Sequence, residues 1–141
     1  MAEITRKELV LALITAGEHP RLRGLDLSGL DMSNLDLTQV NLRGSNLTGA
    51  NLQGAILEGA YLNGADLSHA NLEGAVLISC NLSSCNLSHA NLRNAVLFKA
   101  TMVKADLSGA DLTGSNITQV NLADVFLDQT IMPDGQVHSG G

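Results

Sequence analysis

Two histidines stand twenty residues apart in nearly identical surroundings, and they are the first candidates for chemistry. His69 and His89 both follow the letters Asx-Leu-Ser, with Asp66 and Asn86 three residues before them. If the fold stacks these segments, two imidazoles about 5 Å apart could share a metal ion. No third and fourth ligand accompanies them, so we interpret the pair as a solvated duplication and expect no metal or other cofactor.

Three aspartates recur at forty-residue intervals, with asparagines midway between them. Asp26, Asp66 and Asp106 form the series, and Asn46 and Asn86 fill the gaps. One interpretation is an acidic strip that imitates the phosphates of duplex DNA. The other is that Asp and Asn exchange freely at a position that orders a turn. Carboxylates roughly 10 Å apart would form a dilute strip, and both interpretations stay open.

No catalytic residues are predicted. The sequence has no glycine-rich phosphate loop between a strand and a helix, no nucleophile elbow and no His-Glu-x-x-His motif. Cys80 and Cys85 occupy small apolar positions and are expected to be buried, reduced thiols. We therefore expect a non-enzymatic protein with a cytoplasmic location.

The composition limits the classes of partner that the protein is expected to bind. Eight Lys+Arg oppose 14 Asp+Glu, for a formal net charge of -6, and there is no Trp. Direct nucleic-acid binding is not expected, since it needs clustered cations and stacking rings. The longest apolar run covers only residues 9–14, whereas a membrane helix needs about 20 residues, so no membrane association is expected.

The elements that position these residues follow from a period of five. Every fifth residue from Leu22 to Met132 is apolar, which gives 23 consecutive positions. The residue two before each of them is usually Ala, and the residue just before is mostly Asp or Asn. Neither a helix nor a strand has this period. A solenoid does, if each unit points one small and one large side chain inward and then turns a corner.

A longer repeat gives the number of units in one coil. The segments 67–78 and 87–98 are identical at nine of twelve positions, at an offset of 20 residues. Four units per coil would stack equivalent residues, so residues 20–132 form about 5.75 coils. Glu73 would then lie beside Arg93, and an inter-coil ion pair between them is plausible.

These units identify a family. Segments 65–69, 70–74 and 105–109 (ADLSH, ANLEG and ADLSG) resemble the A(D/N)LXX consensus of pentapeptide-repeat proteins, and the match extends over about 113 residues. The chain is similar to short cyanobacterial members. The resemblance implies an all-β solenoid, a right-handed quadrilateral β-helix with Leu and Ala pointing inward.

The ends are expected to differ. Residues 1–19 hold a predicted capping helix, Arg6 to Ala16, which begins at a Thr5-x-x-Glu8 capping box. Leu9, Val10, Leu13, Ile14 and Ala16 would face the first coil, although a free amphipathic membrane anchor is an alternative. Residues 133–141 are expected to form a turn and a loose tail. Phe126 and Ile131 replace the usual Asp or Asn there, which predicts a homodimer contact at the last coil.

One outer face carries an apolar series. At 20-residue spacing Ile56, Val76 and Val96 should stack, with Ile78 and Phe98 beside them. Such a ladder is either a protein contact or a set of branched side chains that only stabilise the stack. We favour a regulatory protein–protein scaffold with an unidentified partner. The alternatives are a DNA-mimic modulator of gyrase, as in the family's quinolone-resistance proteins, and a structural protein without a specific partner.

Overall fold

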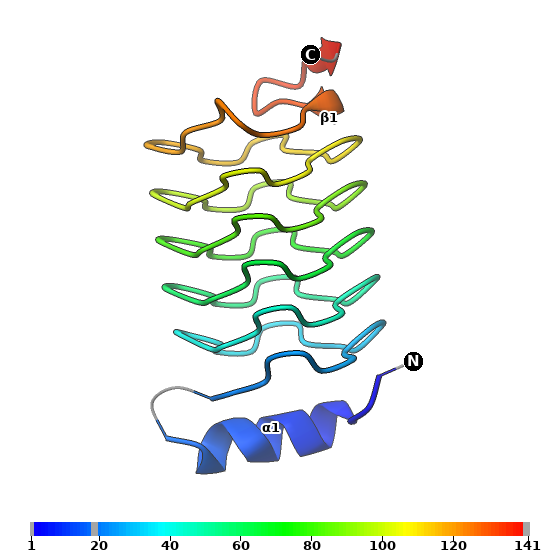
Figure 1. Ribbon diagram of the computed structural model, residues 1–141, viewed down its shortest axis with the longest axis vertical. Helices are drawn as coiled ribbons and strands as arrows, with labels where there is room; N and C mark the ends of the chain where they lie inside the picture. The colour runs from blue at the N-terminus through cyan, green and yellow to red at the C-terminus, as the bar shows by residue number, and fades with distance from the viewer. Residues whose placement is uncertain (1, 18–19, 140–141) are drawn as a thin grey trace.

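The computed structural model describes residues 2–17 and 20–139. Helix α1 (Arg6–Thr15) comes first, and a stack of coils follows it. Two short strands, β1 (Asp128–Ile131) and β2 (Val137–Ser139), lie at the other end of the stack. The result is a rod with a helix at one end and a hairpin at the other (Figure 1).

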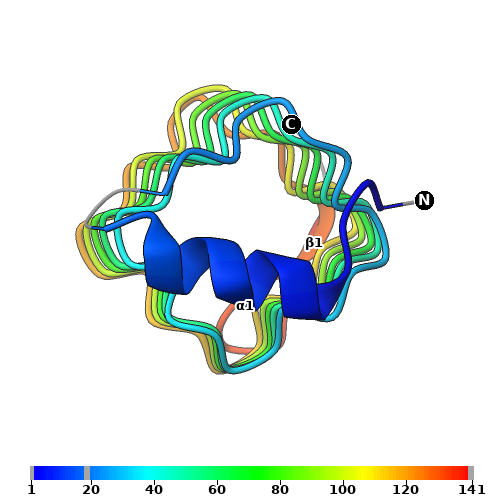
Figure 2. The ribbon, with the colours of Figure 1, turned by 90° about the horizontal axis from the view of Figure 1, so that it is seen from below.

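The coils repeat every twenty residues, as the sequence predicts. Isolated parallel bridges join residues 20 apart from Arg21–Asn41 to Asp111–Ile131 and lie on all four sides of the rod. The Leu77 N–H donates to Val96 O at 2.7 Å, and the Val96 N–H donates to Ala75 O at 2.9 Å. Viewed along the axis, successive coils lie over one another in a four-cornered outline (Figure 2). The fold is a right-handed quadrilateral β-helix.

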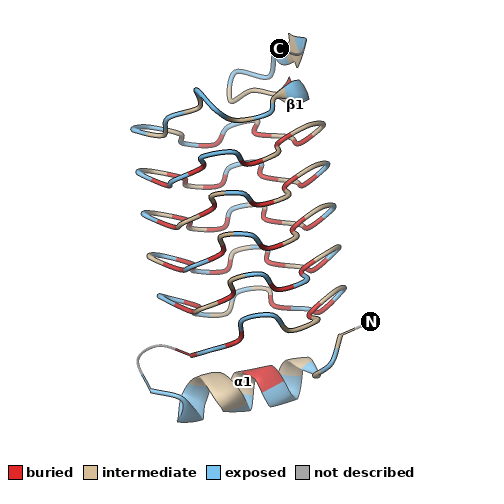
Figure 3. Ribbon diagram, in the orientation of Figure 1, coloured by how far each residue is buried: buried red, intermediate tan, exposed pale blue. Residues whose placement is uncertain are grey.

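The inside of the rod is filled by the two apolar columns. The large column is fully buried from Leu27 through Leu97, and the small column of Ala and Cys side chains is buried beside it. Buried and exposed backbone therefore alternate around every coil (Figure 3). The small side chains two residues before each Leu are enclosed completely or almost completely, as at Ala55, Ala75 and Ala95, so there is little room for a larger group.

The corners are tight turns, and almost all of them have a residue of positive φ. The Ala75 N–H donates to Leu72 O at 3.0 Å, and Gly74 between them has φ +67°. Non-glycine residues also take this conformation, among them His69 and His89 with φ of 60° and 59°. Asp or Asn assists the corner with its side chain, as when Asn71 Oδ1 accepts from the Glu73 N–H at 3.1 Å.

Helix α1 crosses the N-terminal end of the rod (Figure 2). Its predicted capping box is present, with the Glu8 N–H donating to Thr5 Oγ1 at 3.1 Å. Arg6 ties the helix to the first coil by donating to Asp31 O at 2.9 Å and to Ser33 O at 3.0 Å. The core side of the helix centres on Leu9, which is completely buried.

Two details of the predicted cap were wrong. The helix ends at Thr15, and Ala16 is its C-cap. Ile14 is 75% exposed and Ala16 is exposed, whereas Leu13 packs partly against the core. Apolar residues fill positions 9–14 without a gap, so they surround the helix, and a helix lying flat on a coil buries only one narrow stripe.

The C-terminal segment is also more ordered than the expected loose tail. β2 pairs antiparallel with β1, and Ile131 lies opposite Val137. The turn expected at residues 133–135 is present, with the Gly135 N–H donating to Met132 O at 2.8 Å. Residues 140–141 of the predicted tail lie outside the described residues.

Candidate protein-binding face

The outward apolar series forms a continuous ladder on one side of three coils. Ile56 is bridged to Val76, and Val76 is bridged to Val96. Ile56 is 40% exposed, and the valines are half-buried against their neighbours. Ile78 and Phe98 lie two residues further along the same side and are half-buried too. We call these five residues the apolar ladder.

The fold fixes the ladder from inside. Leu57, Leu77 and Leu97 alternate with the ladder residues and are completely buried, which forces their neighbours in the chain to point outward. The apolar series ends in both directions along the rod, because Ile56 is bridged to Asp36 and Val96 is bridged to Asn116. An apolar patch with polar borders results, and a patch of this kind is typical of a contact surface.

Two opposite charges flank the ladder, and sequence reasoning did not single them out. Glu58 lies two residues after Ile56, Lys99 lies directly after Phe98, and both are exposed. The Lys99 ammonium lies 5.2 Å from the centroid of the Phe98 ring. Across the described chain, neither Glu58 nor Lys99 has an ion-pair partner. The twenty-residue register could have shown their placement, because it puts them two coils apart on one side.

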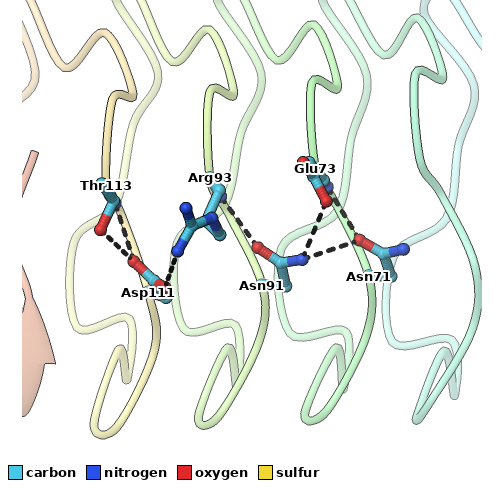
Figure 4. Close-up of polar contacts among 6 residues, drawn as sticks. All are labelled: Asn71, Glu73, Asn91, Arg93, Asp111 and Thr113. Carbon is cyan, nitrogen blue, oxygen red and sulfur yellow. Dashed lines mark hydrogen bonds and ion pairs between the residues drawn. The ribbon is translucent and has the colours of Figure 1, made fainter.

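The neighbouring side carries a polar network (Figure 4). The Asn91 Nδ2 donates to Asn71 Oδ1 at 3.2 Å and to Glu73 Oε2 at 3.4 Å. Arg93 pairs with Asp111 at 3.2 Å. The expected Glu73–Arg93 pair is therefore replaced. Thr113 already orients the Asp111 carboxylate by donating to it from its N–H and hydroxyl, while Glu73 is engaged by Asn91.

The aspartates of the predicted acidic strip bind their own turns. Asp66 Oδ1 accepts from the Ser68 N–H at 3.0 Å, and Asp106 Oδ1 accepts from the Ser108 N–H at 2.9 Å. At Asp26 the hydrogen bonds from Ser28 lower the carboxyl pKa. Asn46 and Asn86 make the equivalent bonds with their amide oxygens. This shared geometry accounts for the exchange of Asp and Asn in the column.

The two histidines do come together. The rings of His69 and His89 stack with centroids 5.1 Å apart and planes 14° from parallel. Both residues are exposed. Parallel rings direct their nitrogen lone pairs alongside each other, so the pair is not arranged to converge on one ion. Over residues 2–17 and 20–139, no group of three or more His, Cys, Asp and Glu side chains is placed to hold a metal.

The cysteines are buried free thiols. Burial raises the pKa of Cys85 to about 12 and raises that of Cys80 well above its ordinary value. The Cys85 thiol donates to Leu62 O. Thiols of this kind fill space in the small column and are poor nucleophiles.

The predicted dimer residues at the last coil have different surroundings. Phe126 is 62% exposed and borders an open groove of about 620 Å³ that Lys104, Asp124 and Asp128 also line. Ile131 is half-buried within β1, where its N–H donates to Ala110 O at 2.9 Å. Phe126 is thus available for contact, and dimerisation there stays a prediction.

The chain belongs to the pentapeptide-repeat family. The family model described as pentapeptide repeats matches overlapping segments from residue 21 to residue 132, with eight copies. A pentapeptide repeat protein of the Arabidopsis thaliana thylakoid lumen is 39% identical, with a TM-score of 0.51, over 74% of this chain and 69% of that one. No curated protein matches the chain at a significant level.

Two further solved structures are similar to the chain. A trypsin-treated variant of QnrB1, a plasmid-mediated fluoroquinolone resistance protein, has a TM-score of 0.60 at 23% identity, over 81% of this chain and 60% of that one. The chain therefore spans about three fifths of that structure. A pentapeptide repeat protein of the cyanobacterium Cyanothece 51142 is 29% identical over 88% of this chain and 99% of that one, with a TM-score of 0.45.

The helical part of the described chain, α1, is too short to cross a bilayer, and no candidate membrane span is found among these residues.

Proposed function

We propose that this pentapeptide-repeat protein is a non-enzymatic binding scaffold and that the apolar ladder is its contact surface for another protein. The observation that carries the proposal is the outward stacking of Ile56, Val76 and Val96 on three successive coils. Asp or Asn stands at the two positions bridged to the ends of this series. In another column the equivalent stacked position is filled by Asn, as at Asn71 and Asn91. The stack itself therefore does not require apolar side chains at this position.

The ladder suits a partner because it is rigid before binding. Every rung is held by backbone hydrogen bonds to both neighbouring coils, and the buried leucines fix its pleat. Little conformational entropy is lost when such a surface binds, so a modest apolar area supports specific recognition.

The test compares Val76→Lys with Asn86→Lys, a matched change in the equivalent column on the opposite side. Each purified variant is used to capture proteins from a lysate of the source organism. A protein captured by the wild type is then purified, and its affinity for each variant is measured by calorimetry. We expect Val76→Lys to weaken binding at least tenfold and Asn86→Lys to leave it unchanged. Equal affinities for all three would overturn the proposal.

The gyrase-modulator alternative receives no specific support from the geometry, because a carboxylate recurs only at every second coil of the column, with Asn46 and Asn86 between. At 23% identity the likeness to QnrB1 shows the shared fold alone.

A further inference from the structure

The apolar ladder has a polarity along the rod that a binding partner must match. Glu58 lies in the first coil of the ladder, beside Ile56, and Lys99 lies in its last coil, beside Phe98. At the end of the ladder nearer Glu58, Asp36 is bridged to Ile56. At the end nearer Lys99, the uncharged Asn116 is bridged to Val96. The side is therefore negative toward α1 and positive toward β1, with apolar residues between.

We infer that the partner of this surface is a second copy of the chain, bound face to face with the two rods antiparallel. This inference rests on the proposed role of the ladder as a contact surface and names its occupant. A twofold axis through the Val76 rung would place Val76 against its own copy and Ile56 against Val96 of the other copy. Isologous pairing of one patch with itself is the commonest form of protein dimer.

Charge selects this orientation over the alternative. With the rods antiparallel, Glu58 of each copy lies opposite the rung that carries Phe98 and Lys99 of the other copy. Two intermolecular ion pairs can form, and no like charges on this side are opposed. With the rods parallel, Glu58 would meet Glu58 and Lys99 would meet Lys99, which is destabilising.

The flanking charges are free to make these contacts. Lys99 lies over Phe98 with its ammonium 5.2 Å from the ring centroid, so its charge stands next to a residue of the ladder. Glu58 and Lys99 lie about 10 Å apart along one rod, too far to neutralise each other. Neither has an ion-pair partner in the described part of its own chain.

The last coil is a weaker candidate for self-association. Phe126 is flanked by Asp124 and Asp128 at the mouth of its groove, where Lys104 is the single cation. An end-to-end pair would bring two such acidic rims together. The other apolar residue expected there, Ile131, is bridged to Asp111 of the preceding coil and is paired with Val137 of β2.

Sedimentation velocity and light scattering on the full chain test the inference. The wild type should pass from the monomer mass of 14.7 kDa to twice that mass as its concentration rises through the micromolar range. Val76→Lys should stay monomeric throughout. Glu58→Lys and Lys99→Glu should each weaken the dimer about tenfold, and the double exchange should restore it, since the pairs re-form with reversed sign.

Control variants distinguish this contact from misfolding and from association through another face of the rod. Circular dichroism shows whether each variant keeps its fold, and Asn86→Lys and Phe126→Asp should leave the dimer unchanged. A wild type that is monomeric at all concentrations would overturn the inference, as would a dimer lost only in Phe126→Asp or a double exchange that does not restore association. A monomeric wild type whose other partner is lost in Val76→Lys would leave the proposed function standing and remove this occupant.

Discussion

The imidazole of His89 lies over Gly109 of the next coil, so that a Cβ atom added to Gly109 would stand 2.5 Å from His89 Nδ1. Gly109 also has φ +71°. Gly49 occupies the same column at φ +65°, and a Cβ atom added there would meet no atom within 4 Å. The two glycines thus share a conformational requirement and differ in their neighbour.

Replacement of these glycines separates backbone strain from steric conflict. Gly49→Ala and Gly109→Ala should each lower the free energy of unfolding by about 1 kcal/mol through the left-handed conformation. Gly109→Ala should lose more, because the His89 ring must leave its place against His69. Urea unfolding measures the difference, and adding His89→Ala to Gly109→Ala should remove the excess. Equal losses at both glycines would show that the His89 contact has no energetic effect.

The small inward column tolerates a hydroxyl better than a large side chain. Ala75 is completely buried between Leu72 and Leu77, so Ala75→Leu should destabilise the protein by about 1–3 kcal/mol through overpacking. Ala75→Ser is the matched control. Its hydroxyl can donate to Leu72 O as Ser45 Oγ donates to Leu42 O at 2.7 Å, and the cost should stay within about 1 kcal/mol. Thermal unfolding compares the two, and a larger loss from Ser than from Leu would contradict this packing.

The twenty-residue register of the rod could be predicted because the residue types repeat with the same period. The duplicated segments around His69 and His89 fix the offset at twenty residues, and the Leu column fixes which side chains point inward. Every bridge between coils follows from these two facts, as does the outward placement of Val76 and Val96.

Features that do not repeat could not be predicted in the same way. The choice of Asp111 over Glu73 as the partner of Arg93 depends on which carboxylate is already oriented, which the column pattern does not encode. Ile14 faces solvent because a short helix can bury only one stripe, and six successive apolar residues leave that stripe unspecified. β2 is a three-residue strand outside the repeat, so no periodic signal marks it.

Burial makes both cysteines unreactive in the folded protein. The pKa of Cys85 is raised to about 12, and Cys80 is completely buried, so little thiolate is present or accessible near neutral pH. We expect no labelling by a thiol reagent at pH 8 in native buffer and two equivalents per chain in denaturant. Mass spectrometry provides the count. Rapid native labelling of either cysteine would show that the coil around Leu82 opens far more readily than its packing indicates.

The ion pair of Arg93 and Asp111 should make stability depend on acidity. Burial alone would raise the Asp111 pKa, but hydrogen bonds from Thr113 and Arg93 lower it below its ordinary value of 3.8. The unfolded chain then takes up the proton first as pH falls, so the stabilisation is complete above the ordinary carboxyl pKa and is lost as pH falls through the folded value.

Asp111→Asn isolates this contribution, because the amide oxygen still accepts from Thr113 while the charge is removed. At pH 7 and low salt the wild type should be more stable than the variant by less than about 1 kcal/mol, since half of the Arg93 side chain is exposed. The difference should shrink below pH 4 and in high salt, which urea unfolding across a pH series measures. A difference that is constant with pH would mean that Arg93 does not distinguish the charged carboxylate from the amide, and the ion pair would then have no part in holding these two coils together.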